Sequence, residues 1–120
     1  MNPHEIRRQM INGLRKAKRA YALNDAEGVF EKMNDEERKA SSQAFMKIVL
    51  AIRTLENLQL RDIADKLREK EPEIVAASNE LNGAVKNLEN FQKILNVSIK
   101  VIGQLKDIAT AVGIPIPDIA

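Results

Sequence analysis

Apolar residues recur every three or four positions over the N-terminal part of the chain. They fall at Ile6, Met10, Leu14, Ala17 and Tyr21. Side chains at this spacing share one face of an α-helix. Asn2 is a candidate N-cap, and Pro3 suits the first helical position, where its missing N–H is not needed. The pattern therefore predicts a helix over about residues 3–22.

Two further helix starts are marked by an asparagine followed by acids, at Asn24-Asp25 and at Asn34-Asp35. The amide can cap free N–H groups of the first turn, and the acids suit the positive end of the helix dipole. The first start predicts a short helix over about residues 25–32, which Gly28 weakens. The second predicts a long helix, because residues 35–70 contain neither Gly nor Pro.

The apolar stripe of this long helix drifts along its length. It runs through Phe45, Ile48, Ile52 and Leu55, then through Leu58 or Leu60, Ile63 and Leu67. The early heptad-like spacing is typical of coiled-coil packing, and the drift rotates the seam around the helix. Pro72 disfavours helical geometry at Glu71 and suits the start of a new helix, so we expect a hairpin turn there. The alternative is one kinked helix of roughly 78 residues, about 115 Å long, which would have to dimerise.

The segment 72–112 carries one apolar stripe at first and a second stripe beyond residue 92. The second consists of Ile94, Val97, Val101, Leu105, Ile108 and Val112. Because two stripes need two neighbours, we expect residues 92–112 to be buried on two sides and residues 55–85, near the turn, on one side only. Gly113 predicts the end of the helix. Ile114-Pro115-Ile116-Pro117 predicts an extended tail that folds back over the bundle or docks on another chain.

Together these elements predict an all-α fold in one domain of residues 1–120. Its centre is a long antiparallel helical hairpin, about residues 35–70 and 72–112. The helix 3–22 and the short helix 25–32 pack at one end, which makes a three- to four-helix bundle, and residues 113–120 form the tail. The composition agrees, because 44% of the residues are hydrophobic but only 3% are aromatic, whereas sheets of this size use more aromatic residues.

Composition also bears on where the protein works. The chain has no cysteine, so it forms no disulfide, which fits a reducing compartment. Its first residues are charged and lack the apolar core of a secretory signal. The longest stretch without a charged residue is Ile108–Pro117, whereas a membrane-spanning helix needs about 20 apolar residues. We expect a soluble, cytoplasmic protein.

The net charge of +2 conceals an uneven distribution. Residues 1–24 hold six Lys or Arg against one acid, whereas residues 25–39 hold six acids against three bases. The six cations of the first helix are the candidate partner-binding residues: Arg7, Arg8, Arg15, Lys16, Lys18 and Arg19. This basic helix suits an acidic protein, nucleic-acid phosphates or anionic lipid. The simpler interpretation is a solvated face that the acids downstream partly neutralise.

The sequence offers few residues suited to catalysis or to metal binding. His4 is the single histidine and lies in the first turn of the predicted helix. Asp62, Asp65 and Glu69 share a helical face, but basic residues alternate with them, which favours a solvated ion-pair face. No phosphate-binding glycine motif is present. The sequence therefore predicts no catalytic residue, no metal site and no cofactor.

The expected function is that of a non-enzymatic helical interaction or assembly protein, whose partner is a second copy of itself or another protein. A homo-oligomer is compatible with this expectation. The first alternative is a small nucleic-acid-associated protein that uses the basic helix. The second is a membrane-active, toxin-like protein whose apolar last helix leaves the bundle.

Overall fold

The computed structural model describes residues 1–116 apart from 27, 29, 88 and 89. Within this part of the chain the fold is an all-α bundle, as predicted. Its α-helices and one 3₁₀ turn are α1 (Pro3–Ala26), η1 (Phe30–Lys32), α2 (Asp35–Asn57), α3 (Leu60–Glu69), α4 (Glu71–Ala84) and α5 (Phe91–Ala111).

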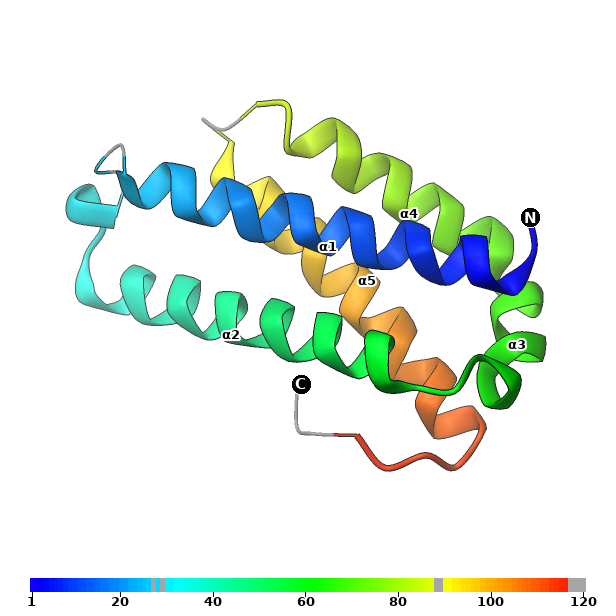
Figure 1. Ribbon diagram of the computed structural model, residues 1–120. Helices are drawn as coiled ribbons and strands as arrows, with labels where there is room; N and C mark the ends of the chain where they lie inside the picture. Colours follow the sequence, from blue (N-terminus) through cyan, green and yellow to red (C-terminus); the bar gives the residue numbers. More distant parts are fainter. Residues whose placement is uncertain (27, 29, 88–89, 117–120) are drawn as a thin grey trace.

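Figure 1 shows α1 lying between α2 on one side and α4 on the other, while α5 crosses behind α1 and the C-terminal part of α2. α5 also packs against α4. The short helix α3 closes the end of the bundle near the N-terminus. α1 packs against each of the four other α-helices, so it is the central element. The bundle measures 44 × 26 × 18 Å along its principal axes.

Two predicted helix starts are confirmed, each by a side-chain cap. Asn2 Oδ1 accepts a hydrogen bond from the backbone N–H of Glu5 at 2.9 Å, at the start of α1. Asn34 Oδ1 accepts one from the N–H of Glu37 at 2.8 Å, and Glu37 Oε1 accepts one from the N–H of Asn34 at 3.4 Å. This reciprocal pair is a capping box, which satisfies two N–H groups that the helix leaves free.

The predicted turn at Pro72 is also confirmed, although α1 lies between α2 and α4, which the predicted hairpin placed side by side (Figure 1). α3 ends at Glu69 and α4 begins at Glu71, with Pro72 in its first turn. Lys70 between them has φ −99° and ψ 8°, and the two helices pack against each other. Because the bundle is 44 Å long, the alternative of a single kinked rod of about 115 Å is excluded.

The predicted helix over residues 35–70 is divided in two by an extended step at Leu58 and Gln59, where ψ is 136° and 126°. The break accommodates the drift of the apolar stripe, since Leu55 in α2 and Ile63 in α3 are both 0% exposed and α3 turns across the end of the bundle (Figure 1). Arg7 stabilises this break, since its guanidinium donates to the carbonyl oxygens of Leu58 at 2.7 Å and Leu55 at 3.5 Å. These carbonyls have lost their helical partners.

The predicted helix over residues 72–112 is likewise divided, into α4 and α5. At the end of α4, hydrogen bonds span three residues instead of four: the N–H of Lys86 donates to Gly83 O and the N–H of Asn87 donates to Ala84 O. Asn90 then caps α5 by accepting from the N–H of Lys93 at 3.4 Å. The break lets α4 lie beside α1 while α5 crosses behind it (Figure 1). Asn90 is a possible N-cap in the sequence, but the apolar stripe that continues past it favoured an uninterrupted helix.

The predicted helix start at Asn24 is wrong, because α1 continues to Ala26. Asn24 is buried, and its Nδ2 donates back to Ala20 O at 3.0 Å, which holds the side chain within α1 instead of capping a new helix. The predicted short helix 25–32 is reduced to η1. Gly28 before it has φ 76°, a left-handed conformation that interrupts a helix.

Burial is uniform along the bundle, so the prediction that residues 55–85 would have one neighbour is wrong. Leu67, Ile74 and Leu81 are 0% exposed, as is Leu105 at the other end. The reason is that α1 does not pack at one end only; it runs along the whole bundle and covers α3 and α4. A Cβ on Gly13 would lie 3.3 Å from Leu81 Cδ2, so the absence of a side chain there permits close approach of α1 and α4.

The C-terminal segment folds back on the bundle through residue 116. Gly113 has φ 73° and donates to Thr110 O, and the N–H of Ile114 reaches Ala109 O at 2.9 Å. This pair of bonds ends α5 at the predicted glycine. Ile114 and Ile116 then pack against the core. Residues 117–120 of the predicted tail lie outside the described residues.

Uniform burial has a measurable consequence. Leu67→Ala and Leu105→Ala are expected to lower the free energy of unfolding by similar amounts, about 2–5 kcal/mol each, because both remove a fully buried aliphatic side chain. Urea denaturation followed by circular dichroism measures both. Leu23→Ala is the control, since Leu23 is 44% exposed, and should cost less than about 0.5 kcal/mol. A much smaller cost at Leu67 than at Leu105 would contradict uniform burial.

Candidate functional site

The predicted basic helix is α1, and its apolar stripe decides where its cations lie. Ile6, Met10 and Leu14 are 0% exposed, so the positions on the opposite side of the helix face outward. Five of the six candidate cations are exposed: Arg8, Arg15, Lys16, Lys18 and Arg19. Arg7 is half-buried.

Three of these cations have partners within the chain. Arg7 caps the end of α2, as described above. Arg15 Nη2 lies 2.9 Å from Glu56 Oε1 of α2, and Lys16 Nζ donates to Asn82 Oδ1 of α4 at 3.1 Å. Arg7 is therefore committed to the fold through backbone carbonyls. Arg15 and Lys16 make exposed contacts that a partner can replace at little cost.

Arg8, Lys18 and Arg19 make no hydrogen bond or ion pair with any of the described residues. No ion pair joins them to the described acids downstream, which are Glu31, Asp35, Glu36 and Glu37. Asp35 instead pairs with Arg38 at 3.7 Å, and Glu37 is used in the capping box of α2. These cations are left to solvent.

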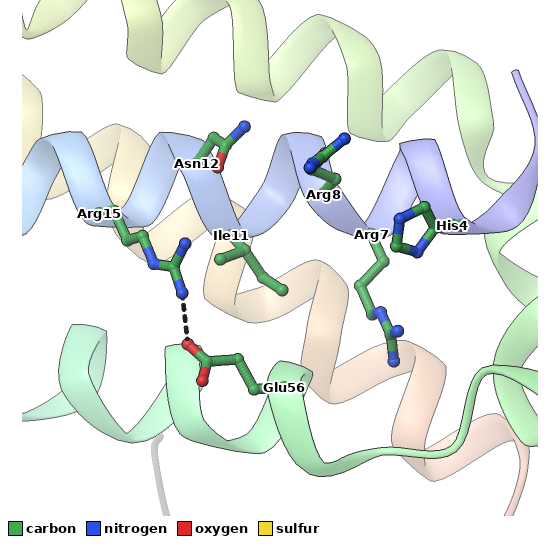
Figure 2. A pocket seen from close by; sticks show the side chains of 7 residues that line it. All are labelled: His4, Arg7, Arg8, Ile11, Asn12, Arg15 and Glu56. Atoms are coloured by element: carbon green, nitrogen blue, oxygen red, sulfur yellow. Dashed lines mark hydrogen bonds and ion pairs between the residues drawn. The ribbon is translucent and has the colours of Figure 1, made fainter.

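A first hollow lies along α1 where it faces α2, with a volume of about 220 Å³. Figure 2 shows Ile11 and Arg15 pointing from α1 toward α2, where Arg15 meets Glu56, while Arg8 and Asn12 stand on the opposite side of α1. The full lining is His4, Arg7, Arg8, Ile11, Asn12, Arg15 and Glu56.

A second hollow of about 310 Å³ lies beyond the Arg15–Glu56 ion pair, which lines both. Its other lining residues are Lys18, Val49, Ile52 and Arg53. We call the two hollows together the α1–α2 groove. Five Lys or Arg line this groove against one acid, Glu56, and that acid is already paired.

The structure therefore separates the predicted site residues into groups. Arg8, Arg15 and Lys18 line the groove and are exposed. Arg7 also lines it but serves the fold. Lys16 and Arg19 line a third hollow, which adjoins the groove and shares Asn12 and Arg15 with it.

Three ionisable groove residues were not among the predicted site residues: His4, Arg53 and Glu56. His4 was considered only as a catalytic base, whereas it forms part of the wall of the first hollow. Arg53 and Glu56 are exposed positions of α2. Nothing local distinguishes them from other polar residues of that helix, because only the packing of α1 against α2 brings them to the groove.

The acidic helical face of Asp62, Asp65 and Glu69 forms local ion pairs, as predicted. Lys66 Nζ lies 3.0 Å from Glu69, Arg68 Nη1 lies 3.5 Å from Asp65, and Arg61 lies 3.8 Å from Asp62. No cluster of three or more His, Cys, Asp or Glu side chains suited to a metal occurs among the described residues. The described helices also include none that is both long and apolar enough to cross a membrane.

Comparison with known proteins adds no relative. No protein-family model, no curated protein and no solved structure matches this chain. The groove therefore has to be interpreted from its own chemistry.

Arg7 and Arg8 are adjacent but have different roles, which provides a matched test. Arg7→Met should lower the free energy of unfolding by about 1–3 kcal/mol, because it leaves the carbonyls of Leu55 and Leu58 without their charged donor. Arg8→Met should change it by less than about 0.5 kcal/mol. Methionine keeps the apolar stem and the helix propensity in both variants. Equal effects in urea denaturation would show that Arg7 does not stabilise the end of α2.

Proposed function

We propose that this protein is a non-enzymatic interaction protein that binds an anionic partner in the α1–α2 groove. The observation that supports this proposal is the charge of the groove: five Lys or Arg surround it against one acid, which is paired with Arg15. Arg8 and Lys18 have no partner among the described residues and remain available to a ligand.

Several cations in one groove are needed for such binding to be useful. A single exposed ion pair contributes only about 0.2–1 kcal/mol, because solvent screens it. A partner that engages several cations together gains their sum, and a groove of one sign also speeds the encounter with an oppositely charged surface. Binding of this kind weakens as salt is added.

An acidic protein is the partner class that we favour, either a second copy or another chain. The protein itself exposes acids on the other side of the Gly28 turn, at Glu31, Asp35 and Glu36. A second copy therefore carries carboxylates that match the groove. Self-association through this contact would be head to tail, because the two surfaces differ.

A nucleic acid is the second candidate, since the unpartnered cations of α1 suit phosphates. Among the described aromatic side chains, Tyr21, Phe45 and Phe91 pack on one another within the fold instead of being free to stack on bases. Tyr21 stacks on Phe45 with ring centroids 4.3 Å apart and lies 5.8 Å from Phe91. Binding would therefore depend on the phosphate backbone of the nucleic acid and not on its base sequence.

Membrane activity, the remaining alternative, has less support. It would require α5 to leave the bundle, and Ile94, Val101 and Leu105 of this helix are all 0% exposed. Their release would remove the largest part of the core. The soluble bundle is the form in which we expect the protein to act.

A charge-reversal experiment tests the proposed function. Arg8→Glu, Lys18→Glu and Arg53→Glu combined should weaken binding of fluorescent polyglutamate at least about tenfold, since three groove cations are replaced by acids. Fluorescence anisotropy across a salt series measures the affinity. Light scattering on the same samples reports self-association.

The matched control carries Lys86→Glu, Lys93→Glu and Lys106→Glu, which changes the net charge equally at exposed positions away from the groove. This control should bind nearly as well as the unaltered protein. Equal losses in both triple variants would mean that net charge, and not the groove, governs binding. That result would contradict the proposal.

A further inference from the structure

We propose that the ligand of the α1–α2 groove is an acidic amphipathic helix with apolar anchors at positions i and i+7. This inference rests on the proposed function and specifies the chemistry of the partner. It comes from three features of the groove: an apolar floor, an ion pair that divides it, and an unequal distribution of cations along its edges.

Apolar residues form the floor of the groove, although most of the exposed surface that lines the second hollow is polar. Ile11 in the first hollow and Val49 in the second are half-buried, and Ile52 beside Val49 is 7% exposed. The phosphate backbone of a nucleic acid has no apolar side chain to place against these three residues. An amphipathic helix places one apolar face in a groove and leaves its polar flanks to the edges, which is the arrangement that this groove fits.

The Arg15–Glu56 ion pair lines both hollows and joins α1 to α2 between them. Ile11 in the first hollow and Lys18 in the second are seven residues apart on α1, about 10.5 Å along the helix axis. A docked helix alongside α1 has the same spacing between positions i and i+7. One anchor therefore enters each hollow, and the residue that crosses the ion pair has to be small.

The cations give the docked helix a direction. Around the second hollow, Lys18 of α1 and Arg53 of α2 supply a positive charge on each edge. Around the first hollow, Arg8 stands on the α1 side, whereas the α2 side presents the Arg15–Glu56 ion pair, in which the two charges neutralise each other. The ligand is thus expected to carry acids on both flanks of one anchor and on one flank only of the other.

Stapled peptides, which a covalent link between side chains holds in a helix, test this inference on the intact protein. The probe has Leu at i and i+7, Ala between them on the same face, and Glu on the flanks. One control replaces both Leu by Ala at unchanged charge, and the other moves one Leu to i+5, which keeps composition and charge but places the anchors on different faces. The probe should bind at least about tenfold more tightly than either control, because an apolar anchor in a pocket carries much of the binding energy.

Variants of the floor supply the reciprocal test. Ile11→Gln and Val49→Gln should each remove most of the preference for the Leu peptide over the peptide in which both Leu are replaced by Ala. Thermal melting checks that each variant is folded. Amide chemical-shift changes in the unaltered protein provide a readout that needs no variant, and they should centre on Ile11 and Val49.

The outcomes separate this inference from the proposed function. If the three peptides and polyglutamate bind equally and the groove charge reversal abolishes binding, the groove binds anions but the helical ligand is wrong. If duplex DNA or RNA binds more tightly than the Leu peptide, the ligand is a nucleic acid and the inference is again wrong. If no anion binds at physiological salt, both proposals fail.

Discussion

The apolar face of α1 has to be covered along its whole length, and the other four helices are arranged around that requirement. Ile6, Met10 and Leu14 have no exposed surface, and they reach the end of the bundle that α3 closes. Each buried aliphatic side chain of this kind stabilises the fold by about 1.5–3 kcal/mol relative to exposure. A bundle in which α1 packed at one end only would leave part of that face, and the facing residues of α3 and α4, in water.

The same requirement explains both breaks in the predicted hairpin. A straight helix over residues 35–70 would carry Ile63 and Leu67 past the end of α1, whereas the extended step at Leu58 turns α3 across it. The step exposes carbonyls at the end of α2, and the guanidinium of Arg7 binds them. The hydrophobic contact and the charged cap thus act together. Burying α3 against α1 requires a break in the helix, and the carbonyl oxygens freed by that break accept hydrogen bonds from a charged donor.

The groove is a consequence of this packing. Because α1 buries one face, its cations lie on the other, and the antiparallel neighbour α2 contributes Arg53 and Glu56 to the opposite edge. Between the two helices Ile11 and Val49 remain half-buried, as is common where the core meets the surface. A surface that combines apolar floor, basic edges and unpartnered cations is suited to recognition, since each feature alone would contribute little.

Local signals by themselves determined where most helices begin and where the chain turns. Asn2, Asn34, Pro72 and Gly113 act through bonds to residues within a few positions, so their effect could be predicted from the sequence. The breaks near Leu58 and Asn90, the extension of α1 through Asn24 and the burial of Leu67 were decided by contacts with distant residues. The candidate site divides in the same way: the basic face of α1 follows from helical periodicity, but its pairing with Arg53 and Glu56 depends on how α1 packs against α2. Only the tertiary structure decides that packing, because it minimises exposed apolar surface over all five helices at once.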